Sequence, residues 1–179
     1  MKMKKMLGPV ALLLLLAGCN VEGSFLFDGD DGVVVELVSI DSEDGYVDTE
    51  GIFLHDGILV ESHFSTGFFS FPLHAIPPHA FISHAFLFIG VHSVFAPEDS
   101  LVIDIFQGSG IYAGSFEIFL SDEMSYVFLD VTDILIDALE GRGDRFQISL
   151  EARDGAVFLE DGGDNLGTGL VPFIEATYF

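Results

Sequence analysis

The sequence contains one cysteine and no tryptophan in 179 residues. A single thiol excludes an internal disulfide and a thiolate metal cluster, so the fold has to be stabilised by its apolar core. Beyond residue 18 there is also no lysine, and three arginines stand against 29 acidic residues, a formal charge of −26. Such a surface repels phosphate and polyuronate backbones, which argues against nucleic acid as a partner.

The first 19 residues have the layout of an export signal and not of a membrane span. Their apolar run is much shorter than the roughly 20 residues that a span needs. Residues 1–5 are basic, residues 10–16 are apolar, and Leu16-Ala17-Gly18-Cys19 follows. These four residues resemble the lipobox of bacterial lipoproteins. The resemblance implies that residues 1–18 are removed and that Cys19 is lipidated, with more than one acyl chain holding the protein in the membrane. The alternative is an ordinary signal peptide with a chance cysteine.

Residue 20 bears on the location of the protein. It is asparagine, and not the aspartate that marks lipoproteins of enteric bacteria for the inner membrane. This favours the outer membrane and leaves the side of that membrane open. Residues 19–32 are then a short acidic tether, and residues 33–179 are one domain, since about 160 residues with this apolar content can bury a sizeable core.

The domain reads as short strands separated by Gly, Asp and Pro, which is typical of an all-β antiparallel β-sandwich or jelly roll. In residues 145–152, for example, apolar and polar residues alternate strictly. One short helix is expected over residues 133–140, with Thr132 or Asp133 as N-cap and Gly141 as its stop, covering one end of the sandwich. Strands are expected at residues 33–40, 52–61 with a turn at Asp56-Gly57, 67–73, 81–91, 101–107, 115–120, 126–131, 145–152 and 173–179.

Two stretches of the domain resemble a known family. Residues 67–73 (GFFSFPL) and 76–87 (IPPHAFISHAFL) are similar to the "G-F-L-x-F-D-L-x-x-I-P-x-G-A-x-I-x-x-A-x-L" segment of DNRLRE-type domains, and residues 129–135 (LDVTDIL) are similar to their strand-to-helix junction. Those domains are jelly-roll sandwiches of bacterial and archaeal surface proteins, and some bind carbohydrate. The resemblance implies buried positions at Phe71 and Leu73. The chain departs from the family at Pro72 and in having no tryptophan.

Asp/Gly-rich loops provide the oxygen atoms and the tight turns that calcium sites use. The loop at residues 41–44 is one of them, and none is an EF-hand, because position 39 is serine where that motif needs glutamate. The alternative is that these are ordinary turn residues on a solubilising or salt-adapted surface. If the loops bind calcium, the ion would be a structural cofactor, and the candidate ligands are Asp28, Asp30, Asp31, Asp161 and Asp164.

Several strands are apolar on both faces, as in residues 86–89 (FLFI). The second apolar face is either covered by other segments or exposed as a contact patch, and coverage by the N-terminal strand and loops is the favoured interpretation. Tyr112, in a Gly-rich loop, is the candidate for stacking on a sugar ring. The histidines at 74, 79 and 84 recur every five residues, which fits neither one helix face nor one strand face, so surface histidines are favoured over a metal site.

Catalytic motifs are not recognisable in the sequence. It has no Gly-x-Ser-x-Gly elbow, no phosphate-binding loop, and no cysteine nucleophile once Cys19 is lipidated. We therefore expect a noncatalytic, lipid-anchored envelope or cell-surface protein with a structural or protein-interaction role. The alternative is a carbohydrate-binding module, assisted by calcium. The expected partners are the membrane and an envelope protein or a polysaccharide.

Overall fold

The computed structural model describes residues 32–108, 110–141 and 143–179. The predicted leader and residues 19–31 of the tether lie outside the described residues. The lipidation prediction at Cys19 and the calcium candidates Asp28, Asp30 and Asp31 fall there too.

Twelve strands and one α-helix make up most of the described chain. The helix α1 spans Thr132–Glu140, and two short 3₁₀ helices are η1 (Asp41–Glu43) and η2 (Leu120–Asp122). The strands are β1 (Val33–Val38), β2 (Gly45–Asp48), β3 (Phe53–Leu54), β4 (Ile58–Glu61), β5 (Ser65–Pro72), β6 (Ile82–Phe95), β7 (Ser100–Gln107), β8 (Ile111–Phe119), β9 (Ser125–Asp130), β10 (Arg145–Ala152), β11 (Ala156–Leu159) and β12 (Phe173–Tyr178).

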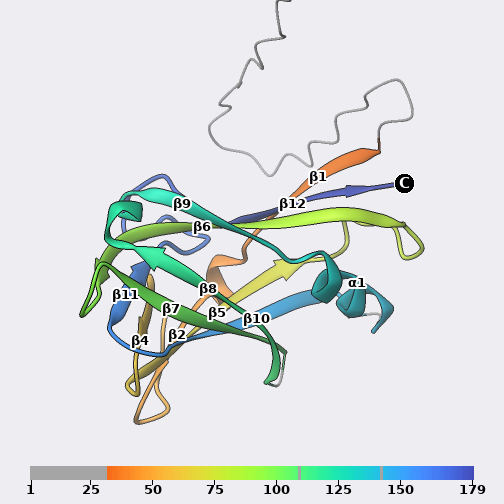
Figure 1. Ribbon diagram of the computed structural model, residues 1–179. Coiled ribbons are helices and arrows are strands. Elements are labelled where there is room, and N and C mark those ends of the chain that lie inside the picture. The colour runs from red at the N-terminus through yellow and green to blue at the C-terminus, as the bar shows by residue number, and fades with distance from the viewer. Residues whose placement is uncertain (1–31, 109, 142) are drawn as a thin grey trace, which may run out of the picture.

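The strands form one continuous antiparallel sheet that curls over into two facing layers (Figure 1). The upper layer has the order β1-β12-β6-β9, and the lower layer has the order β3-β2-β5-β10-β7-β8. The last residues of β6, with β11, β4 and the start of β5, make the corner between the layers. This architecture confirms the predicted all-β antiparallel sandwich.

Strand β6 is long because it belongs to both the upper layer and the corner. Its first residues pair with β12 and β9, and its last residues pair with β11. Gly90 lies near the end of the first part, where it pairs with Tyr126 of β9. A Cβ atom there would be 2.0 Å from the carbonyl oxygen of Leu170, so only glycine allows the segment before β12 to pass so close to the strand.

The core fills the space between the layers, and most strands point alternate side chains into it. Phe71 and Leu73 are buried, as the sequence predicts. The largest fully buried side chains are Phe69, Phe71, Phe146, Leu37, Ile58, Leu87, Ile89, Leu101, Ile103, Ile118, Leu135 and Ile148. They come from both layers and from α1, so the described chain has one shared core.

Helix α1 lies at one end of the sandwich and contacts β6 and β10, one strand from each layer. It buries Leu135 and ends before Gly141, the predicted stop. The predicted N-cap is wrong by one residue. The helix begins at Thr132, whose N–H donates to the Asp130 carboxylate at 2.9 Å, and Val131 occupies the cap position without a side-chain bond.

The sequence did not predict β2 and β11. Each has four residues, and β2 (GYVD) combines a glycine and an aspartate, residues that signal a turn when read locally. Both strands are held by long-range pairing, β2 by β5 and β11 by β4 and β6. The predicted turn at Asp56-Gly57 is present, with Gly57 at φ +79° between β3 and β4.

Candidate functional site

The outer side of the upper layer has a cluster of five aromatic side chains, which we call the aromatic face. The strand register places Phe173, Phe88 and Phe128 directly opposite one another on β12, β6 and β9. Val38 continues the same row onto β1. The members of the aromatic face are Phe86, Phe88, Tyr126, Phe128 and Phe173.

The rings of the aromatic face pack against each other. Phe88 and Phe173 are stacked with centroids 4.6 Å apart and planes 8° apart. Phe128 lies 6.0 Å from Phe88 at 33°, and Tyr126 meets Phe88 edge-on at 90°. Face-to-face packing covers the flat sides of the inner rings, so those rings present mainly their edges outward.

The aromatic face is open in the described structure. Phe128 is 68% exposed and Val38 is 48% exposed. Strand β1 lies beside β12 as an edge strand of the same layer, so it extends the face instead of covering it. The predicted coverage of this second apolar side by the N-terminal strand is therefore wrong. The predicted coverage by loops is seen only where Leu170 passes over Gly90, and any part of it that involves residues before Gly32 lies outside the described residues.

Carboxylates border the aromatic face along one side. The neighbouring cross-strand row pairs Glu36 with Glu175, Glu175 with Phe86, and Phe86 with Asp130. The Asp130 carboxylate accepts hydrogen bonds from the N–H and hydroxyl of Thr132, and these bonds lower its pKa. Glu36 and Glu175 have neither an arginine partner nor a capping role among the described contacts.

Negative charge also acts on the opposite side of the aromatic face. The hydroxyl of Tyr126 donates to the carbonyl oxygen of Val171 at 3.0 Å. Partial burial raises the pKa of Tyr126, and the charges of Asp164, Glu36 and Glu160 raise it further. The aromatic face is thus an apolar strip within a negative field.

The described arginines lie elsewhere. Arg145 is on β10 and Arg153 directly follows that strand, so both belong to the lower layer. The Arg153 guanidinium donates to both carboxylate oxygens of Asp104 on the outer side of β7, from Nη2 at 2.7 Å and from Nε at 3.0 and 3.1 Å.

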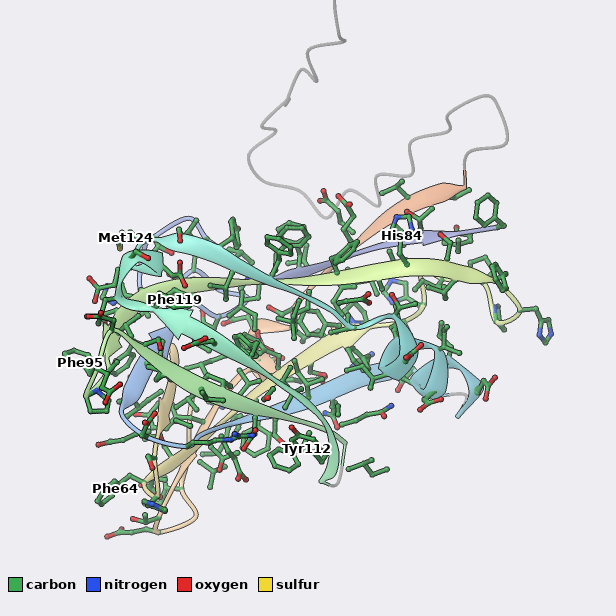
Figure 2. All side chains as sticks on the ribbon, in the orientation of Figure 1. Phe64, His84, Phe95, Tyr112, Phe119 and Met124 are labelled. Atoms are coloured by element: carbon green, nitrogen blue, oxygen red, sulfur yellow. The ribbon has the colours of Figure 1, made fainter. Side chains whose placement is uncertain are left out.

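Tyr112, the predicted sugar-stacking residue, lies on strand β8 at the edge of the lower layer, so the prediction that it belongs to a Gly-rich loop is wrong. It is 56% exposed, and its ring meets Phe106 edge-on at 5.7 Å. Figure 2 shows Tyr112 on the lower layer and His84 on the upper layer, so Tyr112 is on the opposite outer side from the aromatic face. The Arg153–Asp104 pair lies on the same outer side as Tyr112.

The buried Asp161 anchors the segment between β11 and β12. One carboxylate oxygen accepts the N–H groups of Gly163 and Asn165, both at 3.1 Å. The other accepts the Gly57 N–H at 3.0 Å and the Asn165 side-chain amide at 2.8 Å. The carboxylate therefore joins this segment to the β3–β4 turn.

Two further carboxylates hold the same segment. Glu160 is buried and accepts the N–H groups of Leu166 and Thr168, and Asp164 accepts the Gly169 N–H at 2.7 Å. Across the described residues, no three His, Asp or Glu side chains gather closely enough to hold a metal ion. Calcium binding at Asp161 and Asp164 stays a prediction.

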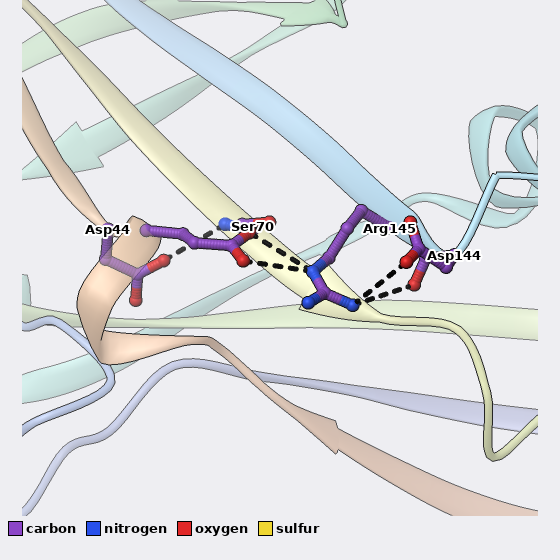
Figure 3. Close-up of polar contacts among 5 residues, drawn as sticks. Asp44, Ser70, Asp144 and Arg145 are labelled. Atoms are coloured by element: carbon purple, nitrogen blue, oxygen red, sulfur yellow. Dashed lines mark hydrogen bonds and ion pairs between the residues drawn. The ribbon is translucent and has the colours of Figure 1, made fainter.

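The loop around η1 forms a polar network against β5 (Figure 3). The buried Asp44 carboxylate accepts the Ser70 N–H at 3.0 Å and the Gly162 N–H at 2.9 Å. Burial raises the pKa of Asp44 to about 7, because desolvation outweighs those two donors. The Ser70 hydroxyl and the Arg145 guanidinium instead lower the pKa of Glu43.

Two hollows lie near the ends of α1. The first, of about 360 Å³, lies between the edge strands β8 and β9 at the start of the helix and is lined by Gly114, Leu129 and Asp133 among others. The second, of about 800 Å³, is a wider depression between the end of the helix and residues 73–79. His74 and His79 line this second hollow. His84 lies elsewhere, on the upper layer, where its ring is hydrogen-bonded to the Thr177 hydroxyl at 2.9 Å. The five-residue spacing therefore does not gather the three histidines.

The described helices include none that is both long and apolar enough to cross a membrane. Comparison of the sequence with protein-family models and with curated proteins finds no match.

The sequence singled out residues 86–89 but missed the partners of Phe86 and Phe88. Tyr126, Phe128 and Phe173 belong to two other strands, 38 or more positions along the chain. The available signal was alternation: Tyr126 and Phe128 flank the inward-facing Val127, and Phe173 precedes the buried Ile174. Only the strand register shows that these residues share one face.

Proposed function

We propose that this protein is a noncatalytic, lipid-anchored component of a bacterial envelope or cell surface that binds another protein through its aromatic face. The main support is the contiguous apolar row formed by Val38, Phe173, Phe88 and Phe128 on a domain with a strongly negative formal charge. Contiguous exposed apolar surfaces with a polar border are typical of protein contact sites, and aromatic residues are enriched in them.

The anchored location is supported by the sequence Leu16-Ala17-Gly18-Cys19 and by the single cysteine. The dozen or so residues between Cys19 and Val33 span at most about 45 Å when fully extended. An anchored domain on that tether stays close to the membrane, where the partners within reach are other envelope components.

The anchor is tested with a Cys19→Ser variant, since a hydroxyl cannot form the thioether. We expect the natural chain to incorporate labelled fatty acid and to fractionate with membranes, and the variant to do neither. Labelling and membrane fractionation of the variant would contradict the anchored location.

The contact role is tested by the size of the protein's complex in mildly solubilised envelopes. We expect Phe128→Ser to shift the protein to its monomer size on a native gel, because the substitution removes the most exposed ring of the aromatic face. Tyr112→Ser is the matched control, with similar exposure on the other layer, and should leave the complex intact. Equal behaviour of the two variants would contradict a role for the aromatic face.

A second candidate function is binding of a neutral carbohydrate at Tyr112. The exposed tyrosine ring, braced by Phe106 beside the Arg153–Asp104 pair, combines a stacking surface with polar groups. A glycan array with and without calcium tests this candidate. Reproducible binding of a neutral glycan that is lost in Tyr112→Ala would favour it over the protein-contact role.

A further inference from the structure

We infer that the aromatic face binds a protein surface with an apolar centre and a border of lysine or arginine side chains. This inference rests on the proposed contact function and specifies its partner. The row from Val38 to Phe128 crosses four strands, a width of about 14 Å at the usual strand spacing. The partner's apolar centre has to match this width, and its cations have to lie beside it.

Charge is the first argument for a cationic partner. Glu36, Glu175 and Asp130 lie along one side of the aromatic face, and Asp164 raises the pKa of Tyr126 on the other side. Both described arginines are paired on the lower layer. A partner with its own cations would therefore complement charges that the described domain leaves unbalanced on this face.

The same charges argue against two other occupants. A second copy would bring the same carboxylates to the interface, in a chain with a formal charge of −26 after residue 18 and few cations to offset them. A bilayer surface presents phosphate groups, which the carboxylates around the face repel. Like-charge contacts of either kind oppose binding.

Ring geometry argues against a sugar at this face. Stacking on a sugar needs an open ring face, and the Phe88 and Phe173 rings cover each other at 4.6 Å. Ring edges and aliphatic side chains instead suit the irregular apolar surface of another protein.

The test uses a photoreactive phenylalanine analogue placed at position 128 of the full chain, in washed envelopes of the producing cells. The same analogue at position 112 is the control for general crowding. We expect position 128 to cross-link to one protein, and the cross-linked peptide to contain apolar residues flanked by lysine or arginine. Position 112 should not give this product.

The ionic contribution is measured on the same product. Raising the salt from 0.1 M to 1 M shortens the Debye length from about 10 Å to about 3 Å and should reduce the yield several-fold. The double variant Glu36→Gln, Glu175→Gln keeps the shape of both side chains and should also reduce the yield several-fold at 0.1 M. Glu151→Gln removes an exposed carboxylate from β10 on the lower layer and should leave the yield unchanged.

The remaining outcomes overturn the inference. Position 128 could cross-link to a second copy, to lipid, to the chain's own residues before Gly32, or to no molecule. It could also cross-link to a protein whose yield does not change with salt or in the glutamate variants; that result would leave the contact function standing and remove only the cationic partner.

A failure of the lipid anchor would be detected separately, by membrane fractionation of the Cys19→Ser variant. Irradiation of whole cells in place of washed envelopes would then still test the inference.

Discussion

The two outer sides of the sandwich differ in whether arginine side chains pair with their carboxylates. On the lower layer, Arg145 lies 3.1 Å from Glu43, and Arg153 lies 2.7 Å from Asp104. On the upper layer, the carboxylates beside the aromatic face have no such arginine in the described residues. The lower side therefore holds both described arginines, each paired with a carboxylate, beside exposed carboxylates such as Glu151. The upper side combines apolar surface with carboxylates that have no arginine partner, the combination expected of a binding surface.

The inner sides of the two layers should be equally important for stability. Substitutions there give the reference loss of stability against which the outer sides are compared. Phe71→Ala in the lower layer and Leu87→Ala in the upper layer each remove a fully buried side chain. Each should lower the free energy of unfolding by about 2 to 5 kcal/mol through lost burial and a residual cavity. Chemical denaturation measures both. A loss near zero in one layer would mean that its inward-facing residues are misassigned.

The η1 network at the margin of the lower side should make stability depend on pH. The pKa of Asp44 is raised to about 7 in the folded protein, so its contribution is complete below the ordinary value near 4 and is lost as the pH rises through 7. For this group alone, we expect the free energy of unfolding to fall by about 2 to 3 kcal/mol between pH 5 and pH 8.

An Asp44→Asn variant isolates that effect, because its side chain has no charge to titrate. Its stability should vary less with pH than that of the natural chain over the same range. The lowered pKa values of Glu43 and Asp130 act in the opposite direction and at lower pH, since their stabilisation is lost on acidification. Identical slopes for the variant and the natural chain would exclude Asp44 as the cause.

On the upper side, Phe128→Ser should cost the isolated protein about 1 kcal/mol or less. The side chain is 68% exposed and loses mainly its ring contacts with Phe88 and Phe86. A thermal melt should therefore barely move, although we expect the same substitution to release the protein from its proposed envelope complex. A loss as large as that of Leu87→Ala would show that Phe128 is structural, and the contrast between the inner and outer sides would disappear.

The smallest effect is expected for Arg145→Gln on the lower side. Its ion pair with Glu43 is partly exposed, and such pairs contribute about 0.2 to 1 kcal/mol. Titration followed by NMR should show that the pKa of Glu43 rises but stays low, because the Ser70 hydroxyl is the larger cause of its shift. A Glu43 pKa that stays unchanged would remove Arg145 from the network.

Alternation along single strands made much of this fold predictable. Residues 145–152 match β10 fully, and α1 and Gly141 agree with the sequence pattern to within one residue. The inward position of Phe71 also followed from sequence. Strands β2 and β11 were missed because four residues are too few to show a period, and long-range pairing holds them.

The candidate site was less predictable, for two physical reasons. Alternation shows that Phe86 and Phe88 form a second apolar side, but only the register shows that β1 lies beside it. The Asp/Gly loops are ambiguous because a turn and a calcium site use the same residues. The Asp161 carboxylate accepts a hydrogen bond from the N–H of Gly57, which lies 104 positions away in the chain, so the local sequence could not predict this contact.

The most direct test of the account compares the reactivity of two engineered thiols in intact envelopes. Cys19 is the sole cysteine and is expected to be acylated, so Phe128→Cys and Tyr112→Cys each introduce one reactive thiol. Maleimide labelling is measured in envelopes and again in the purified protein. The account predicts that labelling of Phe128→Cys is suppressed several-fold in envelopes and restored on purification, whereas Tyr112→Cys reacts equally in both. Equal labelling of Phe128→Cys in envelopes and in purified protein would contradict the claim that the aromatic face is the contact surface.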